Sequence, residues 1–195
     1  MTLIAFIRHG NTDWNIEKRA QGHANNPLNK RGIKQAEAVA ERLSNENWDV
    51  FFSSDLLRAT QTAEIIASKT KIPIKAFCKE LRELDRGQIE GTIEKDRIEK
   101  WGKEWRKYDL KQETTQSVQK RGVRFVRKIV DQYPEKKVLV VGHGFMIAQT
   151  LRALFKNDTE EYEEPDNASI TVIEKKMKDW KYLIYNSTTH LDIKD

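Results

Sequence analysis

The chain has 195 residues, of which 38 % are hydrophobic and 33 % are charged. That apolar share excludes a wholly disordered chain, and the length fits one sizeable domain whose core needs neither disulfides nor a structural metal. Cys78 is the sole cysteine, which excludes an internal disulfide and a cysteine-based zinc site. The single thiol, and an amino-terminal apolar run of only five residues, predict a cytoplasmic protein without a membrane span.

The charge balance is weakly basic, with 35 Lys and Arg residues against 30 Asp and Glu residues and a net charge of +5. Basic and acidic residues alternate, as in residues 94–107. A solvent-exposed helix face explains that run better than a nucleic-acid surface does. We therefore expect no nucleic-acid partner and no membrane partner.

Short apolar runs and helical periodicity alternate along the chain. Residues 3–7 and 138–141 predict strands buried on both faces, as in a parallel sheet, and residues 50–53 predict another strand. Apolar residues recurring at helical spacing predict helices over residues 30–44, 55–68, 118–132 and 145–155. This alternation predicts an α/β fold, with a mostly parallel central sheet between two layers of helices.

The carboxyl-terminal part has a different pattern. Residues 169–175 and 180–185 flank a short polar turn and follow Pro165, which marks a boundary. Two such runs predict an antiparallel hairpin.

A charged segment, residues 89–117, contains no strand pattern. We interpret it as a small helical cap inserted in a single domain that covers residues 1–195. Trp101 and Trp105 lie four positions apart, so we expect them on one face of a cap helix, packed beneath the cap rather than forming a platform for substrate. Trp14 belongs either to the core or to the wall of a pocket, and the core is the favoured interpretation.

Two His-Gly pairs, His9-Gly10 and His143-Gly144, each follow a predicted buried strand. Ligands bind at the carboxyl ends of parallel strands, so both histidines belong to the same edge of the sheet. The glycines permit tight turns, and the N–H groups of such turns attract anions. Arg8, directly before His9, carries a guanidinium suited to bidentate phosphate binding. The pattern predicts a phosphate site.

Other candidates are ambiguous on the residues alone. Arg58 lies in the first turns of a predicted helix and is either a phosphate ligand or a solvated side chain. Glu83, Asp85 and Glu90 lie close together in a later segment. One carboxylate near phosphate-binding cations can act as a general acid, but three surface carboxylates explain the segment equally well.

Taken together, these segments resemble the motifs of the histidine phosphatase superfamily, also called phosphoglycerate mutase-like. The resemblance covers almost the whole chain, and within the family the chain is most similar to small bacterial broad-specificity phosphatases. It implies the three-layer phosphoglycerate mutase-like fold. The matching segments are RHGNTDWN (8–15), QGHANNPLNKRGIKQA (21–36), SSDLLRATQTA (53–63), LRELDRGQIEG (81–91), VVGHG (140–144) and NSTTHL (186–191).

The resemblance implies a phosphohistidine intermediate on His9. Arg8, Arg58 and His143 would bind the transferring phosphoryl group, and Glu83 would act as general acid and then as general base. His9 must be neutral to attack and His143 is more useful protonated, so their environments must separate their pKa values. The implied phosphate-binding residues, by side chain or backbone, are Thr12, Asn15, Gln21, Gly22 and Gly144.

The implied activity is hydrolysis of small-molecule phosphate monoesters without a metal or other cofactor. Only about 35 residues separate Glu83 from the helix predicted at residue 118, whereas the metabolic mutases of the family carry a longer insertion there. A shorter cap implies a more open site, where water accepts the phosphoryl group. A phosphoglycerate mutase and a phosphate-binding module without turnover are the alternatives. Metal-dependent hydrolysis is disfavoured because Arg8 and Arg58 would repel a cation, and the oligomeric state, a homodimer included, stays open.

Departures from the family's motifs concern the pocket rather than the catalytic groups. Ile89 stands where the family often has Trp, and Gln112 where it has Gly, so we expect the loop near Glu113 to differ in shape. Two further histidines are not assigned to catalysis. We expect His23 to be a solvated loop residue and His190 to make structural contacts.

Overall fold

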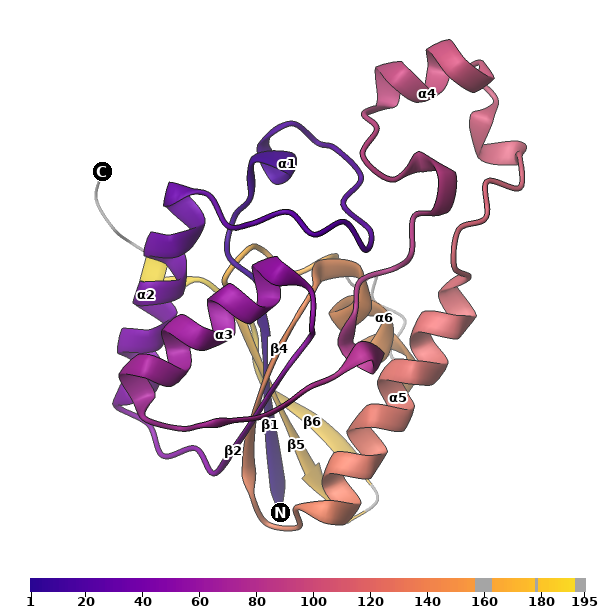
Figure 1. Ribbon diagram of the computed structural model, residues 1–195. Coiled ribbons are helices and arrows are strands. Elements are labelled where there is room, and N and C mark those ends of the chain that lie inside the picture. Colours follow the sequence, from indigo (N-terminus) through magenta and orange to yellow (C-terminus); the bar gives the residue numbers. More distant parts are fainter. Residues whose placement is uncertain (157–162, 178, 192–195) are drawn as a thin grey trace.

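The computed structural model describes residues 1–156, 163–177 and 179–191. Its centre is a six-stranded sheet in the order β3-β2-β4-β1-β5-β6, with helices on both faces (Figure 1). Strands β1 to β4 are parallel, whereas β5 pairs antiparallel with β1 and with β6. The predicted α/β class with a mostly parallel sheet is confirmed. The strands are β1 (Thr2–Arg8), β2 (Val50–Ser53), β3 (Ile74–Phe77), β4 (Lys137–Gly142), β5 (Ile170–Lys176) and β6 (Asp179–Ser187).

Of the six strands, only β3 was not predicted. Its four residues pair with β2 at the edge of the sheet and alternate between half-buried and exposed. An edge strand this short buries too little to show a clear apolar run. The sequence therefore lacked a signal for it.

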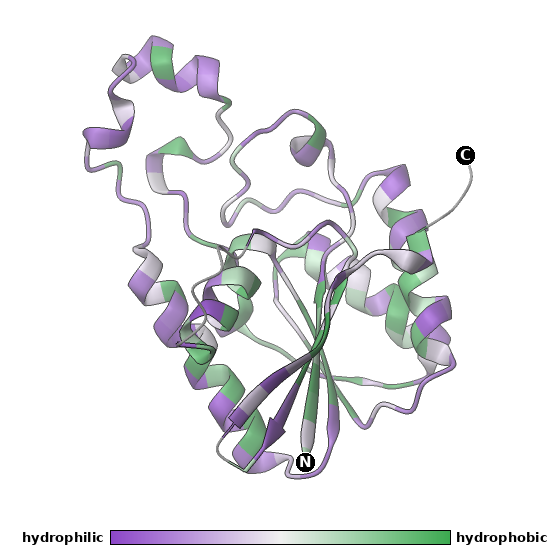
Figure 2. Ribbon diagram, turned by 180° about the vertical axis from the view of Figure 1, so that it is seen from behind, coloured by the Kyte–Doolittle hydropathy of each residue, from purple (hydrophilic) through white to green (hydrophobic). Residues whose placement is uncertain are grey.

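Two hydrophobic cores lie on opposite faces of the sheet, because successive side chains of a strand point in opposite directions. From β1, Ile4 and Phe6 pack into the core beneath helices α5 and α6, while Ala5 and Ile7 pack beneath α2 and α3. Figure 2 shows the central strands as mostly hydrophobic. The bounds of these helices are α2 (Lys30–Ser44), α3 (Leu57–Thr70), α5 (Thr115–Gln132) and α6 (Gly144–Leu154).

The four long helices match the four predicted from periodicity, with small shifts at their ends. Helix α3 begins at Leu57, and Asp55 before it instead pairs with Arg82, whose Nε and Nη2 atoms lie 2.7 and 2.6 Å from the two carboxylate oxygens. A single helical turn, α1 (Asp13–Ile16), was not predicted and is too short for a periodic signal. Among the described residues, no helix is both long and apolar enough to cross a membrane.

The cap segment contains α4 (Glu94–Trp101) and lies beyond the carboxyl edge of the sheet, as does α1 (Figure 1). The expectation that Trp101 and Trp105 share one helix face is wrong. Gly102, with a φ of +81°, ends α4, and Trp105 lies in a separate 3-10 turn, Trp105–Lys107. Trp105 is buried with Ile89 and Leu110, so its packing beneath the cap is as expected.

Candidate active site

The two histidines of the His-Gly pairs lie side by side, because their strands are neighbours in the sheet. Arg8 pairs with Gly142 at the ends of β1 and β4, and the His9 N–H donates to the Gly142 carbonyl over 3.0 Å. The ring centroids of His9 and His143 are 5.1 Å apart, at an interplanar angle of 59°. Both side chains are buried.

His9 is held in one tautomer by its own loop. Its Nδ1 lies 2.7 Å from the carbonyl oxygen of Gly10. A carbonyl only accepts, so Nδ1 carries the proton and Nε2 keeps its lone pair. Burial, with the charges of Arg58 and Arg8, lowers the pKa of His9 well below its ordinary value. The ring is therefore neutral at pH 7, and the unprotonated Nε2 lies at the cavity that His9 lines.

Arg58 is a fully buried cation beside that lone pair. Its Nε donates to His9 Nε2 over 3.2 Å. Its remaining nitrogens donate to the carbonyls of Ala24 and Gly22 and to the amide oxygen of Asn26, over 2.9 to 3.2 Å. Burial lowers the pKa of Arg58 to about 10, so the side chain stays charged at neutral pH. Neutral acceptors fix the guanidinium without cancelling its charge.

Arg8 supplies a second cation. One of its terminal nitrogens donates to the Pro165 carbonyl over 2.6 Å, while its Nε is buried and has no acceptor among the described residues. Gly144 packs against it, because a Cβ at this position would lie 2.9 Å from the Arg8 Cζ and 2.7 Å from the Glu164 Oε2. Gly144 therefore allows these charged groups to approach the start of α6.

His143 lies behind His9 and does not line the cavity itself. Its Nε2 is 2.9 Å from the Ser54 hydroxyl, and its Nδ1 is buried without a partner among the described residues. Burial, followed by the Arg58 charge, lowers the pKa of His143 well below its ordinary value. The pKa values of both histidines thus shift in the same direction in the unliganded protein.

The loop after β1 holds the polar residues expected around the phosphate. Asn15, Gln21 and Gly22 line the cavity. Thr12 is fully buried and does not, which corrects the expectation that it lines the pocket. Its hydroxyl instead accepts from the Asn15 N–H and lies 3.1 Å from the Gln21 amide oxygen. Thr12 therefore supports Asn15 and Gln21, which line the cavity.

Glu83 faces the cavity from the loop after β3 and is 8 % exposed. Its carboxylate accepts from the Leu84 N–H over 2.8 Å and from the Met146 and Phe145 N–H groups over 3.1 and 3.2 Å. The last two belong to the first turn of α6, whose amides have no partner within the helix. The carboxylate is thereby fixed at one point of the cavity.

A half-buried ion pair holds the Glu83 backbone. The guanidinium of Arg121, on α5, donates to both carboxylate oxygens of Glu113 over 2.9 Å and to the Glu83 carbonyl over 3.0 Å. His23 Nε2 donates to the same carbonyl over 2.8 Å, so His23 is a structural contact rather than a solvated residue. These contacts were missed because each joins segments far apart in the sequence.

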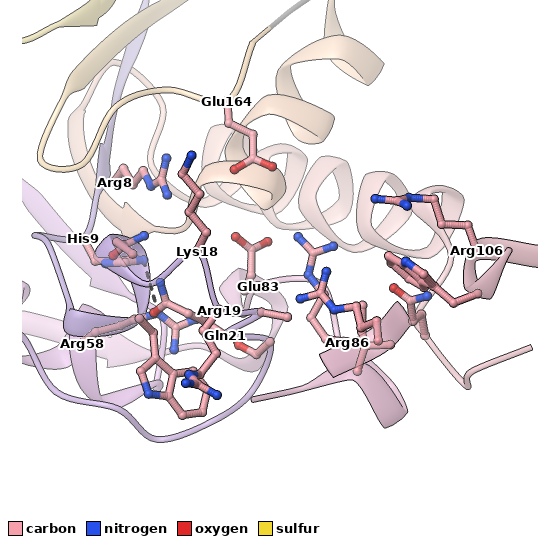
Figure 3. A pocket seen from close by; sticks show the side chains of 18 residues that line it. Arg8, His9, Lys18, Arg19, Gln21, Arg58, Glu83, Arg86, Arg106 and Glu164 are labelled. Atoms are coloured by element: carbon pink, nitrogen blue, oxygen red, sulfur yellow. Dashed lines mark hydrogen bonds between the residues drawn. The ribbon is translucent and has the colours of Figure 1, made fainter. Parts of the chain in front are cut away.

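The cavity has a volume of about 530 Å³ and is strongly cationic (Figure 3). Trp14 forms part of its wall, which is the less favoured of the two positions expected for it. Glu164 also lines it and was not predicted; partial desolvation and the Glu83 charge raise its pKa. Within the described residues, no three His, Cys, Asp or Glu side chains form a group that could hold a metal ion. The cations beyond Arg8 and Arg58 are Lys18, Arg19, Arg86, Arg97 and Arg106.

Comparison with known proteins assigns this site to a family. The model of the histidine phosphatase superfamily, branch 1, matches residues 4–188, so the chain belongs to that superfamily. It is 33 % identical over 192 residues to the phosphatase PhoE of Bacillus subtilis, covering 98 % of this chain and 97 % of that protein. It is 30 % identical over 203 residues to the metal-independent phosphoserine phosphatase of Arabidopsis thaliana, covering 98 % and 84 %. The solved structure of Bacillus stearothermophilus YhfR superposes with a TM-score of 0.87 at 27 % identity, covering 98 % of this chain and all of that one.

Proposed function

We propose that the protein is a phosphatase that hydrolyses small-molecule phosphate monoesters through a phosphohistidine on His9. One observation carries the proposal: a neutral imidazole, its lone pair held at Nε2, faces a cavity between two arginines. In the first step Nε2 forms a bond to phosphorus, the bond to the ester oxygen breaks, and the leaving alkoxide takes a proton from Glu83. Water then attacks phosphorus, gives its proton to Glu83 and releases His9 and inorganic phosphate.

Two guanidinium groups stabilise the negative oxygens of the transferring group. Arg58 and Arg8 are preorganised by carbonyl acceptors, so they need no rearrangement when charge develops. His143 is the third donor in this proposal. Its buried Nδ1 has no partner among the described residues and lies behind His9, so it reaches a phosphoryl oxygen only after the side chains of the cavity adjust to the bound ester. A bound dianion favours the protonated imidazolium, which compensates for the cost of charging a buried ring.

Glu83 is the proton donor and acceptor. Its carboxylate lies in the same cavity as His9, and two amides at the start of α6 hold it there. A dianionic ester bound at Arg8 and Arg58 brings negative charge beside Glu83 and favours its uptake of a proton. That proton is the one the leaving group needs.

Hydrolysis, rather than return of the phosphoryl group to the product, is supported by the cavity and by the relatives. The cavity is lined by polar and charged side chains that water reaches, and two similar proteins carry phosphatase names. A mutase would have to hold the dephosphorylated product in place. Isomerisation of 3-phosphoglycerate faster than its hydrolysis would favour the mutase.

The decisive experiment is trapping of the intermediate. We expect the pure protein to hydrolyse p-nitrophenyl phosphate and, in rapid-quench runs with a phosphorus-labelled ester, to carry an acid-labile, alkali-stable label on His9. His9→Ala should abolish both signals, while His190→Ala, which removes a histidine outside the cavity, should keep them. Label on another side chain would overturn the mechanism. Tight phosphate binding without hydrolysis of any ester in a broad panel would indicate a binding module.

A further inference from the structure

We propose that a second anion site recognises the alcohol part of the substrate, so that the preferred esters carry a carboxylate or a second phosphate. This inference rests on the proposed function and deepens it. We call the site the tail subsite. It is formed by Arg86, Arg97, Trp105, Arg106 and Gln112, all of which line the cavity.

The position of Glu83 sets the direction of the bound ester. Figure 3 shows Arg8, His9 and Arg58 on one side of Glu83, and Arg86 and Arg106 on the other. The phosphoryl group occupies the first side, and the proposed proton donor must reach the ester oxygen. The carbon skeleton that leaves with that oxygen therefore extends past Glu83, toward the tail subsite.

Arg86 is the anchor of the tail subsite. Its Nε atom is buried and has no acceptor among the described residues. Its guanidinium lies over the Phe145 ring, 5.8 Å from the centroid. The turn that carries Arg86 is fixed, because the N–H of Gln88, two residues later, donates to the Leu110 carbonyl over 2.8 Å. A buried guanidinium atom without an acceptor is costly unless a ligand supplies one.

Two more arginines flank Trp105 above this anchor. Arg97 donates from Nε to the Thr92 hydroxyl over 2.8 Å and lies 5.2 Å from the Trp105 ring centroid. Arg106 lies 4.3 Å from the same centroid, and Glu94 already pairs with it through two hydrogen bonds of 2.9 and 3.1 Å. Glu94 also pairs with Arg97, whose Nη1 lies 3.5 Å from the Glu94 Oε2. Arg86 is therefore the least compensated of the three charges, and Arg106 lies at the rim.

The balance of charges that line the cavity also favours a substrate with an anionic tail. Seven Lys and Arg side chains line it against two carboxylates, Glu83 and Glu164. Arg8 and Arg58 together match a phosphoryl dianion, and Glu94 pairs with Arg97 and Arg106. An ester with a neutral tail therefore leaves the charge of Arg86 without an ion-pair partner among the described residues. A tail that carries its own negative charge complements it.

A matched series of three-carbon esters tests the proposal. The compounds are 3-hydroxypropyl phosphate, 3-phosphonooxypropanoate and propane-1,3-diol bisphosphate, which differ only in a neutral, carboxylate or phosphate end. Binding is measured by calorimetry on His9→Ala, which does not depend on turnover, and kcat/KM is measured on the wild-type protein. We expect both anionic tails to bind about 10- to 100-fold tighter than the neutral one, as a charge-assisted hydrogen bond predicts.

Substitution of the anchor localises the effect. Arg86→Gln should reduce the preference for anionic tails, measured as the ratio of dissociation constants to that of 3-hydroxypropyl phosphate, about tenfold or more. Arg86→Lys should keep part of the preference, because the charge remains without the fork. Arg127→Gln is the control: it removes one exposed cation from α5 outside this cavity and should leave the preference unchanged.

The outcomes separate this inference from the proposed function. Equal dissociation constants for all three compounds would overturn the tail subsite even if the protein is an efficient phosphatase. A preference that Arg127→Gln weakens as much as Arg86→Gln would also overturn it, because it would then reflect net charge alone. A preference in binding without any turnover would support the tail subsite and refute the phosphatase. The order of the carboxylate and phosphate tails identifies the anion.

Discussion

Arg58 Nε and His9 Nε2 lie 3.2 Å apart, so the nitrogen that attacks phosphorus in the proposed mechanism accepts a hydrogen bond from a buried cation. The contact orients the imidazole, and the Arg58 charge adds to burial in lowering the pKa of His9. In the proposed mechanism the entering phosphoryl group would take the place of His9 as one of the acceptors of Arg58. The same cation would then help to keep His9 neutral and to stabilise the transferred group.

Arg58→Lys should lower kcat/KM for p-nitrophenyl phosphate by about 10²- to 10³-fold. A lysine ammonium cannot contact His9 while donating to Gly22, Ala24 and Asn26 as the guanidinium does. Steady-state kinetics measures the loss. Arg42→Lys is the matched control and should retain activity. Arg42 is a half-buried arginine on α2 that donates to the Ser187 hydroxyl, outside the cavity. A threefold effect at Arg58 would contradict the assigned role.

Glu83→Gln should slow alkyl esters about 10²-fold or more, and aryl esters less than tenfold. An alkoxide needs a proton as it leaves, whereas an aryl oxide departs with less help. The measurement is kcat/KM across esters whose leaving groups differ in pKa. Equal slowing of alkyl and aryl esters would show that Glu83 is not the proton donor, and Glu64→Gln on α3 controls for loss of a carboxylate elsewhere.

The unliganded protein should lose stability as the pH falls below 6.5. Burial lowers the pKa values of His9 and His143 in the folded state, so the unfolded chain binds protons first. The two histidines therefore cost no stability above about pH 6.5, which is their pKa in the unfolded chain. Toward acid pH the free energy of unfolding decreases, by at most about 1.4 kcal/mol per histidine at pH 5.5. Denaturant unfolding between pH 7.5 and 5.5 measures it. His143→Gln should flatten the dependence, and identical slopes for both proteins would contradict the assignment.

Arg121→Gln should act on catalysis through Glu83. The substitution removes the ion pair with Glu113 and the hydrogen bond to the Glu83 carbonyl. We expect kcat for alkyl esters to fall about tenfold, with a smaller loss for aryl esters, because a misplaced proton donor matters most for poor leaving groups. Arg124→Gln, exposed on the same helix, is the control. A uniform loss for all esters, in step with lost stability, would show a structural role only.

Gly144→Ala should impair substrate binding more than stability. The added methyl group would lie 2.9 Å from the Arg8 Cζ and 2.7 Å from the Glu164 Oε2, so it displaces charged side chains rather than backbone. We expect KM to rise at least about tenfold with little change in the melting temperature. Gly122→Ala is the contrasting variant: its methyl group meets the Thr150 side chain between α5 and α6 and should reduce stability first. The same loss of stability in both would contradict this assignment.

The sequence by itself determined the layers of this protein and the edge where its site lies. Apolar runs and helical periodicity are local signals, and they located five strands and four long helices, although they missed the short edge strand β3. The two His-Gly pairs follow strands that the sheet makes neighbours, so both histidines reach one edge.

Only the tertiary structure decided how that site is supported and what lies around it. It gave Ser54 as the partner of His143, Arg121 as the support of the Glu83 backbone, and Arg86 as a cation that lines the cavity and whose Nε is buried. It also placed Trp14 in the cavity wall. Each of these arrangements depends on packing between segments that are distant in the chain, and neither periodicity nor a short motif carries information about such contacts.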